Sequence, residues 1–221
     1  MNTDHRPLLD IYHSVDALPG IKKSFIGSGV RYDLLLHKSG ETQRDKAAAD
    51  YTKELILKHV SGRLKVAPEH TSERVLHYMR KPSFDLFRKF KVIFDKVNAE
   101  AGLHQQLIPY FISSHPGCTE EDMAELAVET KRLQFHLEQV QDFTPTPMTV
   151  STEMWYAGYH PYTLERVFSA KSPQEKLRQR MFFFWYKPEE RRKIVAELRR
   201  MGRDDLIGRL FGPMQVNKTG K

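Results

Sequence analysis

Polar residues that could bind a ligand come directly after three apolar segments of the chain. Glu69 and His70 follow the short segment 63–67, which is β-branched at its centre, residues 113–117 (SSHPG) follow a longer apolar run, and residues 28–31 (SGVR) follow a third segment. Carboxylate, imidazole, hydroxyl, guanidinium and glycine-exposed backbone N–H groups together are typical of a polar ligand site. A site of this kind is therefore the first functional hypothesis.

A fourth loop, residues 141–147 (QDFTPTP), joins these three because its prolines exclude a regular element. The carboxyl ends of parallel strands meet at one rim, and ligands bind there in barrels and open sheets. We therefore expect the four loops to lie together at this rim and to form one ligand site. The candidate binding residues are Ser28, Arg31, Glu69, His70, Ser113, Ser114, His115, Gln141 and Thr144.

Two other chemistries use some of the same residues. Glu69, His70 and His115 suit zinc or iron, although no fixed spacing such as HExxH supports a metal site. Cys118 is the one cysteine, so an internal disulfide is excluded and a reducing compartment fits. No spacing pairs it with a histidine, but a place at a helix N-terminus would lower its thiol pKa. The other helix and strand histidines, such as His59, are interpreted as structural.

The elements that position these loops alternate along the first 150 residues. Strands are predicted at 21–26, 63–67, 106–113 and 135–140, and helices at 8–15, 32–36, 47–59, 83–101 and 120–133, with a shorter helix capped by Thr71 or Ser72 and a polar loop at 38–46. Alternating strands and helices indicate right-handed parallel crossovers, and hence an α/β barrel or open sheet.

The composition changes after residue 150. Residues 153–162 are dense in aromatic side chains, and helices are predicted at 174–185, 188–201 and 204–210, with frayed residues at 213–221. The chain is therefore divided into residues 1–150, the α/β part, and residues 151–221, an aromatic-rich linker and a helical region.

Positive charge is concentrated in the last fifty residues. Residues 171–221 hold fourteen Lys and Arg against six Asp and Glu, so the rest of the chain carries minus one of the net charge of +7. The basic segments 191–193 and 199–200 could bind RNA or phosphate, with the aromatic run 182–186 stacking on bases. A solvated helical face and an aromatic core are the competing interpretation. No apolar run is long enough to cross a membrane and the polar amino terminus is no signal peptide, which predicts a cytoplasmic location.

Four long segments of the sequence resemble a known family. SGVRYDLLL, SGRLKVAPEHTSERVLHYMRKPSFDLFRKF, QQLIPYFISSHPGCTEEDMAELA and LEQVQDFTPTPMTVSTEMWYAGYHPYT are similar, in order, to the carboxyl-terminal half of YgiQ-type radical S-adenosylmethionine (radical SAM) proteins. The resemblance implies a partial (β/α) barrel with a 4Fe-4S cluster and S-adenosylmethionine. It implies that the cluster reduces the sulfonium, and that a 5′-deoxyadenosyl radical abstracts hydrogen from a substrate.

The resemblance also assigns places to the candidate residues. The four predicted strands resemble the third to sixth of that barrel, so the candidate residues would surround the ribose, the adenine and the substrate. Three cluster cysteines in a CxxxCxxC loop and a glycine-rich acidic motif are part of the family pattern, and this sequence contains neither.

We therefore expect a fragment or split-gene product that neither assembles the cluster nor catalyses by itself. Its partner would be an amino-terminal half that supplies the cysteine loop, or a second copy joined through the open barrel edge. An inactive remnant is the third interpretation.

Overall fold

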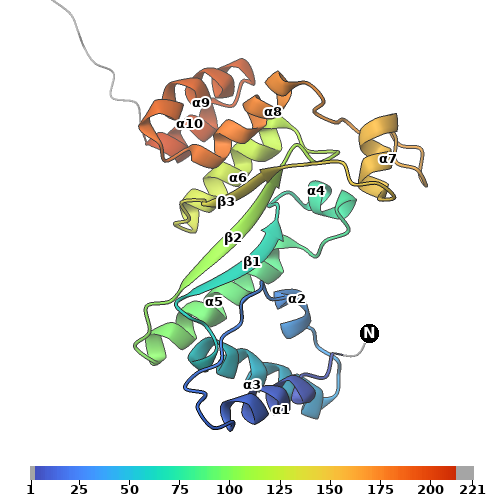
Figure 1. Cartoon of the computed structure of the whole chain (residues 1–221). Coiled ribbons are helices and arrows are strands. Elements are labelled where there is room, and N and C mark those ends of the chain that lie inside the picture. Colours follow the sequence, from blue (N-terminus) through green and yellow to red (C-terminus); the bar gives the residue numbers. More distant parts are fainter. Residues whose placement is uncertain (1–2, 213–221) are drawn as a thin grey trace, which may run out of the picture. The chain divides into compact units, whose positions relative to one another are not determined.

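The structure, a computed structural model, describes residues 3–212 of the 221-residue chain, so the predicted fraying at 213–221 lies outside it. Its elements are shown in Figure 1 and follow the order α1 (Arg6–Asp16), α2 (Tyr32–Leu35), α3 (Thr42–Lys58), β1 (Arg63–Glu69), α4 (Glu73–Tyr78), α5 (Phe84–Glu100), β2 (Gln106–Ser113), α6 (Glu120–Arg132), β3 (Gln139–Asp142), α7 (Val150–Ala157), α8 (Pro173–Arg180), η1 (Met181–Phe184), α9 (Pro188–Arg200) and α10 (Asp204–Phe211).

The chain folds as two compact units. Unit 1 contains Met1–Pro68 and Pro82–Tyr110, and unit 2 contains Glu69–Lys81 and Phe111–Lys221. Strands β1 and β2 each begin in unit 1 and end in unit 2, so their carboxyl ends belong to unit 2. The predicted division places a single boundary near residue 150, whereas each of these units combines two separate segments of the chain. The two divisions differ in kind, and the predicted one stays a prediction.

Three strands form one small parallel sheet in the order β1-β2-β3. The backbone N–H of Gln106 bonds to the carbonyl of Gly62 (2.8 Å) where β2 begins, and that of Phe143 bonds to the carbonyl of Ser113 (2.8 Å) where it ends. Since β2 is the central strand, its Leu107, Ile108 and Phe111 are buried. The predicted mixed α/β class with a parallel sheet is confirmed.

Unit 1 buries a core between helices. In Figure 1, α1 lies beside α3, and α3 and α2 both pack on α5. Helix α5 places Phe84, Phe87, Phe90 and Phe94 in this core, in agreement with the predicted apolar stripe. It begins where predicted because the Ser83 side chain accepts from the backbone N–H of Asp85.

Unit 2 is built around α6. Helices α8 and α10 and the 3₁₀ turn η1 pack on α6, and α9 packs on η1 and α10. Thr119 and Asp122 form a capping box at the start of α6, which confirms the predicted cap. The helix predicted at 174–185 stops at Arg180 and continues as η1, in which Phe182 and Phe183 are fully buried.

Several predicted boundaries are wrong for local reasons. Residues 21–26 form no strand, and beyond them an isolated parallel bridge joins Val30 to Val66; Ile21 and Phe25 are exposed and Ile26 is half-buried, so two of the three apolar side chains of this run lie outside the core. The strand predicted at 135–140 begins later, as β3. The preceding residues end α6: Gln134 has a left-handed φ of 61°, and the next residue, Phe135, caps the helix.

Three other differences concern the ends of elements. Strand β1 continues through Pro68 to Glu69, since a strand at the edge of the sheet tolerates a missing N–H. Helix α3 begins inside the predicted polar loop 38–46, and α7, capped by Thr149, was not predicted. None of the helices within residues 3–212 combines the length and apolarity that crossing a bilayer demands.

Candidate binding site at the strand ends of unit 2

The nine predicted site residues are divided between the units. Ser28 and Arg31 belong to unit 1 and the other seven to unit 2. Ser28 is exposed on the segment that leads to the Val30 bridge. The Arg31 guanidinium donates two hydrogen bonds to Asp33, from Nε (2.8 Å) and Nη2 (2.6 Å), and this carboxylate raises the pKa of Arg31. An anionic ligand would therefore compete with Asp33 for Arg31.

Two strands of the sheet end in unit 2 at buried polar residues with a left-handed backbone. Glu69, the last residue of β1, has φ 67°, and Ser114, the residue after β2, has φ 61°. This conformation costs a side-chain-bearing residue about 1 kcal/mol or more, and such strain is concentrated at functional sites. Both strand ends therefore have the backbone expected of a binding site.

Both residues also carry a buried polar atom with no hydrogen-bond partner among the described residues. One carboxylate oxygen of Glu69, Oε1, is 3.0 Å from Lys81 Nζ, whereas Oε2 is buried and unpaired. The Ser114 hydroxyl is likewise buried and unpaired, with the residue only 1% exposed. A buried polar atom without a partner costs about 1–3 kcal/mol, which a bound ligand would recover.

The third strand contributes Asp142 and not the predicted Gln141. Ser113 Oγ donates to Asp142 Oδ1 (2.5 Å), and Arg180 Nη1 of α8 donates to Asp142 Oδ2 (3.2 Å). Gln141 and Thr144 are exposed, and Thr144 Oγ1 donates to the Asp142 carbonyl (3.4 Å). At the end of β3, the Asp142 carboxylate therefore accepts hydrogen bonds from both the Ser113 hydroxyl and the Arg180 guanidinium.

His115 is held as a neutral imidazole that accepts a hydrogen bond. Its Nδ1 lies 2.8 Å from the carbonyl oxygen of Pro116, to which it must donate, so Nε2 accepts from the Ser151 hydroxyl of α7 (2.9 Å). Burial lowers the pKa of His115 to about 4. The ring is therefore uncharged at pH 7, and both of its nitrogens are occupied.

His70 pairs with Cys118, a contact that the sequence pattern did not predict. The backbone N–H of Ser72 donates to His70 Nδ1 (3.0 Å), so the ring proton is on Nε2, which lies 3.4 Å from Cys118 Sγ. This nitrogen donates to sulfur and has no lone pair with which to deprotonate the thiol. Burial lowers the pKa of His70 to about 4.

The suggestion that a helix N-terminus lowers the thiol pKa of Cys118 is wrong, whereas the lack of support for Cys118 as a nucleophile agrees with its contacts. Cys118 lies one residue before the N-cap Thr119, fully buried, and burial raises its thiol pKa well above the ordinary value. The metal alternative gains no support from these contacts, because the imidazoles of His70 and His115 are turned toward other partners. Within the described part of the chain, no three His, Cys, Asp or Glu side chains are grouped as metal ligands.

Helix α8 holds the loop between Ser114 and Cys118 through one residue that was not predicted. The Gln179 side chain accepts from the backbone N–H of Ser114 (2.7 Å) and donates to the carbonyl of Cys118 (2.8 Å), and it is 1% exposed. Gln179 is 65 residues from Ser114, so no local pattern could have indicated it. The conformation of this strand-end loop therefore depends on the carboxyl-terminal helices.

Gly117 shows how tightly the same loop is packed. Its N–H bonds to the carbonyl of Phe168 (2.7 Å), its φ is +85°, and a Cβ at this position would lie 2.3 Å from the ring of Tyr78 in α4. Only glycine fits both the left-handed backbone and the nearby ring.

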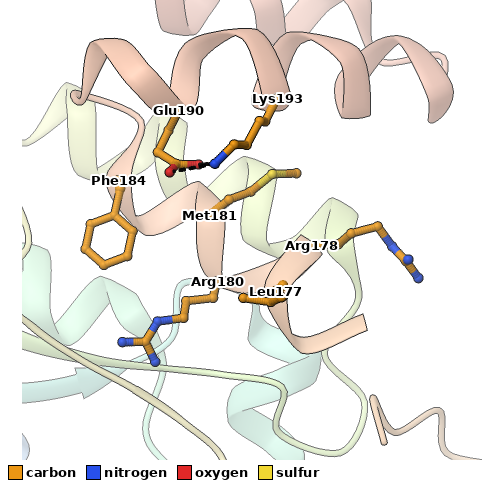
Figure 2. Close-up of a pocket in the computed structure, with 7 residues that line it drawn as sticks. All are labelled: Leu177, Arg178, Arg180, Met181, Phe184, Glu190 and Lys193. Carbon is orange, nitrogen blue, oxygen red and sulfur yellow. Dashed lines mark hydrogen bonds and ion pairs between the residues drawn. The ribbon is translucent and has the colours of Figure 1, made fainter. Parts of the chain in front are cut away.

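A separate cavity of about 390 Å³ lies between α8, η1 and α9. Figure 2 shows apolar Leu177, Met181 and Phe184 in this cavity, with Glu190 Oε1 paired to Lys193 Nζ (3.1 Å) on its α9 side. Because Phe182 and Phe183 are buried, they are not available to stack on bases, and the core interpretation of the aromatic run holds for them.

Comparison with known proteins first defines the class of the carboxyl-terminal region. Residues 138–221 match a family model described as "Domain of unknown function (DUF3362)". This match begins just before β3 and includes Asp142, Gln179 and all of the helices from α7 to α10.

The full chain is similar to proteins named UPF0313 protein. It is 74% identical over 212 residues to one from Bacteroides thetaiotaomicron, 65% identical over 211 residues to one from Porphyromonas gingivalis, and 43% identical over 213 residues to one from Pseudomonas syringae pv. tomato. These matches cover 96%, 96% and 94% of this chain and 34%, 33% and 26% of the relatives. These proteins of the UPF0313 (YgiQ) family are homologues of almost the whole chain, which confirms the family resemblance, and the chain spans a quarter to a third of their length.

Proposed function

We propose that this chain is the carboxyl-terminal part of a radical SAM enzyme, and that the strand ends of unit 2 hold the nucleoside portion of S-adenosylmethionine. The observation that carries the proposal is the pair of buried, unpaired oxygens, Glu69 Oε2 and Ser114 Oγ, at the ends of neighbouring strands. The sequence resemblance supports the same assignment, and so does the order of β1, β2 and β3 as later strands of a partial (β/α) barrel.

The donor set of unit 2 fits a nucleoside. A carboxylate oxygen without a partner accepts hydrogen bonds from ribose hydroxyls or an amine, and a serine hydroxyl can both donate and accept. Lys81 Nζ lies 3.0 Å from the other Glu69 oxygen, so the buried carboxylate has a counter-charge. The chemistry that S-adenosylmethionine supplies in this class is hydrogen abstraction from a substrate carbon.

The 4Fe-4S cluster does not fit the residues of this chain. Cluster iron is held by several thiolates. This sequence has one cysteine, Cys118. Its side chain is buried and accepts a hydrogen bond from His70, and the pKa of its thiol is raised. The proposal therefore assigns the cluster ligands to polypeptide outside residues 1–221, such as an amino-terminal part that pairs with this chain, and we derive no reaction step through the cluster.

Equilibrium dialysis against labelled S-adenosylmethionine tests the nucleoside site. We expect saturable binding that weakens about tenfold or more in Glu69→Gln or Ser114→Ala, because each change removes a hydrogen-bonding partner of the ligand. Glu153→Gln is the matched control, since Glu153 is an exposed carboxylate of unit 2. Absence of saturable binding, or equal binding by all variants with intact far-ultraviolet spectra, contradicts the proposal.

Iron and sulfide analysis after anaerobic reconstitution tests the assignment of the cluster ligands. We expect far less than four irons per chain, and the same content in Cys118→Ala. A stoichiometric cluster that Cys118→Ala abolishes would show that this chain supplies cluster ligands after all.

A further inference from the structure

Helix α1 of unit 1 has an apolar side that the other described elements leave exposed. Leu8, Ile11 and Val15 are spaced by three and four residues, so they lie on one side of the helix. None of the eleven residues of α1 is buried. Because an isolated helix of this length is marginal in water, we expect its apolar side to have a packing partner.

A different side of α1 holds the helix on α3, beside which it lies in Figure 1. His13 Nε2 is 2.9 Å from Glu54 Oε1, and the ring of Tyr12 stacks on that of His59 with 3.9 Å between the ring centroids. These contacts are polar and aromatic. They fix the helix in unit 1 and leave its aliphatic side chains in solvent.

The apolar surface continues along residues 21–26. Ser24 Oγ donates to Asp16 Oδ1 (2.6 Å), and the Ile26 N–H bonds to the carbonyl of His59 (2.9 Å), so this run is held against α1 and the end of α3. We call the resulting surface the 8–25 face. Its large apolar side chains are 42–58% exposed and comprise Leu8, Ile11, Leu18, Ile21 and Phe25.

The backbone of the same run is also open. The N–H groups of residues 22–25 form no backbone hydrogen bond within residues 3–212. An open run with apolar side chains is a ready template for a strand of another segment. The 8–25 face therefore offers a partner both apolar side chains and backbone donors.

The number of neighbouring apolar residues sets this face apart within unit 1. The other large apolar side chains that are exposed among the described residues of unit 1 are Leu57 of α3 and Val92 of α5, one on each helix. Single exposed apolar residues are common on monomers, whereas a larger patch indicates an interaction surface. The 8–25 face is of the second kind.

We propose that the 8–25 face packs against the part of the UPF0313 polypeptide that lies outside residues 1–221. The matches cover 34%, 33% and 26% of the homologues, so most of each homologue is available to cover this face. Aliphatic side chains around an aromatic anchor such as Phe25 are typical of the core of a stable interface. The proposal rests on unit 1 and on the homologues, and it stands or falls separately from the nucleoside site of unit 2.

Other occupants fit the face less well. A nucleic acid requires cations opposite its phosphates, and the side chains that form this face are apolar. A membrane-surface helix is rich in Lys and Arg on its polar side, whereas α1 carries Asp10 and Asp16. A second copy of this chain would bury the same side chains, and the experiments distinguish it from the proposed partner.

Co-expression tests the proposed partner. A tagged form of this chain is expressed together with the portion of the Bacteroides thetaiotaomicron homologue that lies outside the match. We expect the two polypeptides to co-purify. Ile11→Asp and Phe25→Asp should each lower the co-purified amount at least tenfold, because each places a charge in an apolar interface. Val92→Asp is the matched control, since Val92 is 67% exposed on a helix and Ile11 is 58% exposed; it should co-purify as the unmodified chain does.

Amide hydrogen exchange in the intact homologue is a second measurement, which needs no separate folding of the two portions. The segment of the homologue that corresponds to residues 8–25 should exchange at least tenfold more slowly than in this chain, because the interface protects it. The segment that corresponds to residues 88–95, around Val92, should exchange alike in both proteins.

Three results would overturn the proposal. The first is equal exchange of the 8–25 segment in the homologue and in this chain, and the second is equal loss of co-purification in Ile11→Asp and Val92→Asp. The third is a dimer of the isolated chain that Ile11→Asp dissociates in analytical ultracentrifugation, which would assign the face to a second copy.

Discussion

Two buried histidines at the strand ends, His70 and His115, predict that unit 2 loses stability as the pH falls. The pKa of each is lowered to about 4 by burial, against an ordinary value of 6.5. Between these values the unfolded chain binds more protons than the folded chain does, so the free energy of unfolding decreases with decreasing pH. This stabilising contribution is complete above pH 6.5 and is lost progressively down to pH 4.

The magnitude follows from the difference in pKa between the two states. For His115 the difference corresponds to about 3 kcal/mol over the whole window, of which about 2 kcal/mol is lost between pH 7 and pH 5. His70 acts in the same direction, although the nearby Asp122 carboxylate favours its protonated form. The effect of His115 alone is therefore the sharper prediction.

Urea unfolding followed by tryptophan fluorescence measures this effect in the correct unit, because both tryptophans, Trp155 and Trp185, belong to unit 2. His115→Gln removes the titrating group, so the stability difference between the unmodified chain and this variant should shrink by about 2 kcal/mol from pH 7 to pH 5. His77→Gln, at an exposed position of α4, should leave its own difference nearly constant. A difference for His115→Gln that stays constant or grows toward pH 5 would refute the reasoning.

Three other predictions concern the loop that follows β2. Gly117→Ala should cost about 2–4 kcal/mol in urea unfolding because of the left-handed backbone and a 2.3 Å approach to a ring; Gly202→Ala, with φ +71° but open space, should cost clearly less, and equal costs would contradict the packing argument. Gln179→Ala should cost about 2–4 kcal/mol, since it leaves two buried backbone groups without partners, whereas the exposed Gln174→Ala should be nearly neutral; two neutral variants would mean that α8 does not hold the loop. Cys118 should react with iodoacetamide only in urea, and rapid alkylation of the native chain would contradict its burial and raised pKa.

Features that depend on neighbouring residues were predictable from the sequence. The caps Ser83 and Thr119 fix the starts of α5 and α6, and the continuous apolar run of β2 identifies a central strand. The pairing of Arg31 with Asp33 is also local, because only Tyr32 lies between them, but the sequence pattern indicates either a ligand-binding turn or a tight turn with a surface arginine, and not this ion pair.

Features that depend on the tertiary fold were not predictable in this way. The apolar residues after α6 indicate a strand from residue 135. In the structure, the segment that follows the left-handed Gln134 ends the helix, and the strand β3 is therefore short. The contact between His70 and Cys118 joins two loops 48 residues apart. Gln179 can hold the loop after β2 only because α8 packs beside this strand end, and no spacing in the sequence indicates that α8 does so.

The candidate site illustrates both cases. Glu69, His70, Ser113, Ser114 and His115 were found from their positions after strands, because strand ends are recognisable as sequence boundaries. Their individual roles depend on which atoms have partners, and only the fold determines that.

The central claim is that the ends of β1 and β2 in unit 2 bind a nucleoside. Amide hydrogen exchange measured by mass spectrometry, with and without saturating S-adenosylmethionine, tests this claim most directly. The account predicts slower exchange in segments 66–72 and 111–118 and unchanged exchange in α3 of unit 1. Unchanged exchange in both strand-end segments, or protection confined to other parts of the chain, would contradict it.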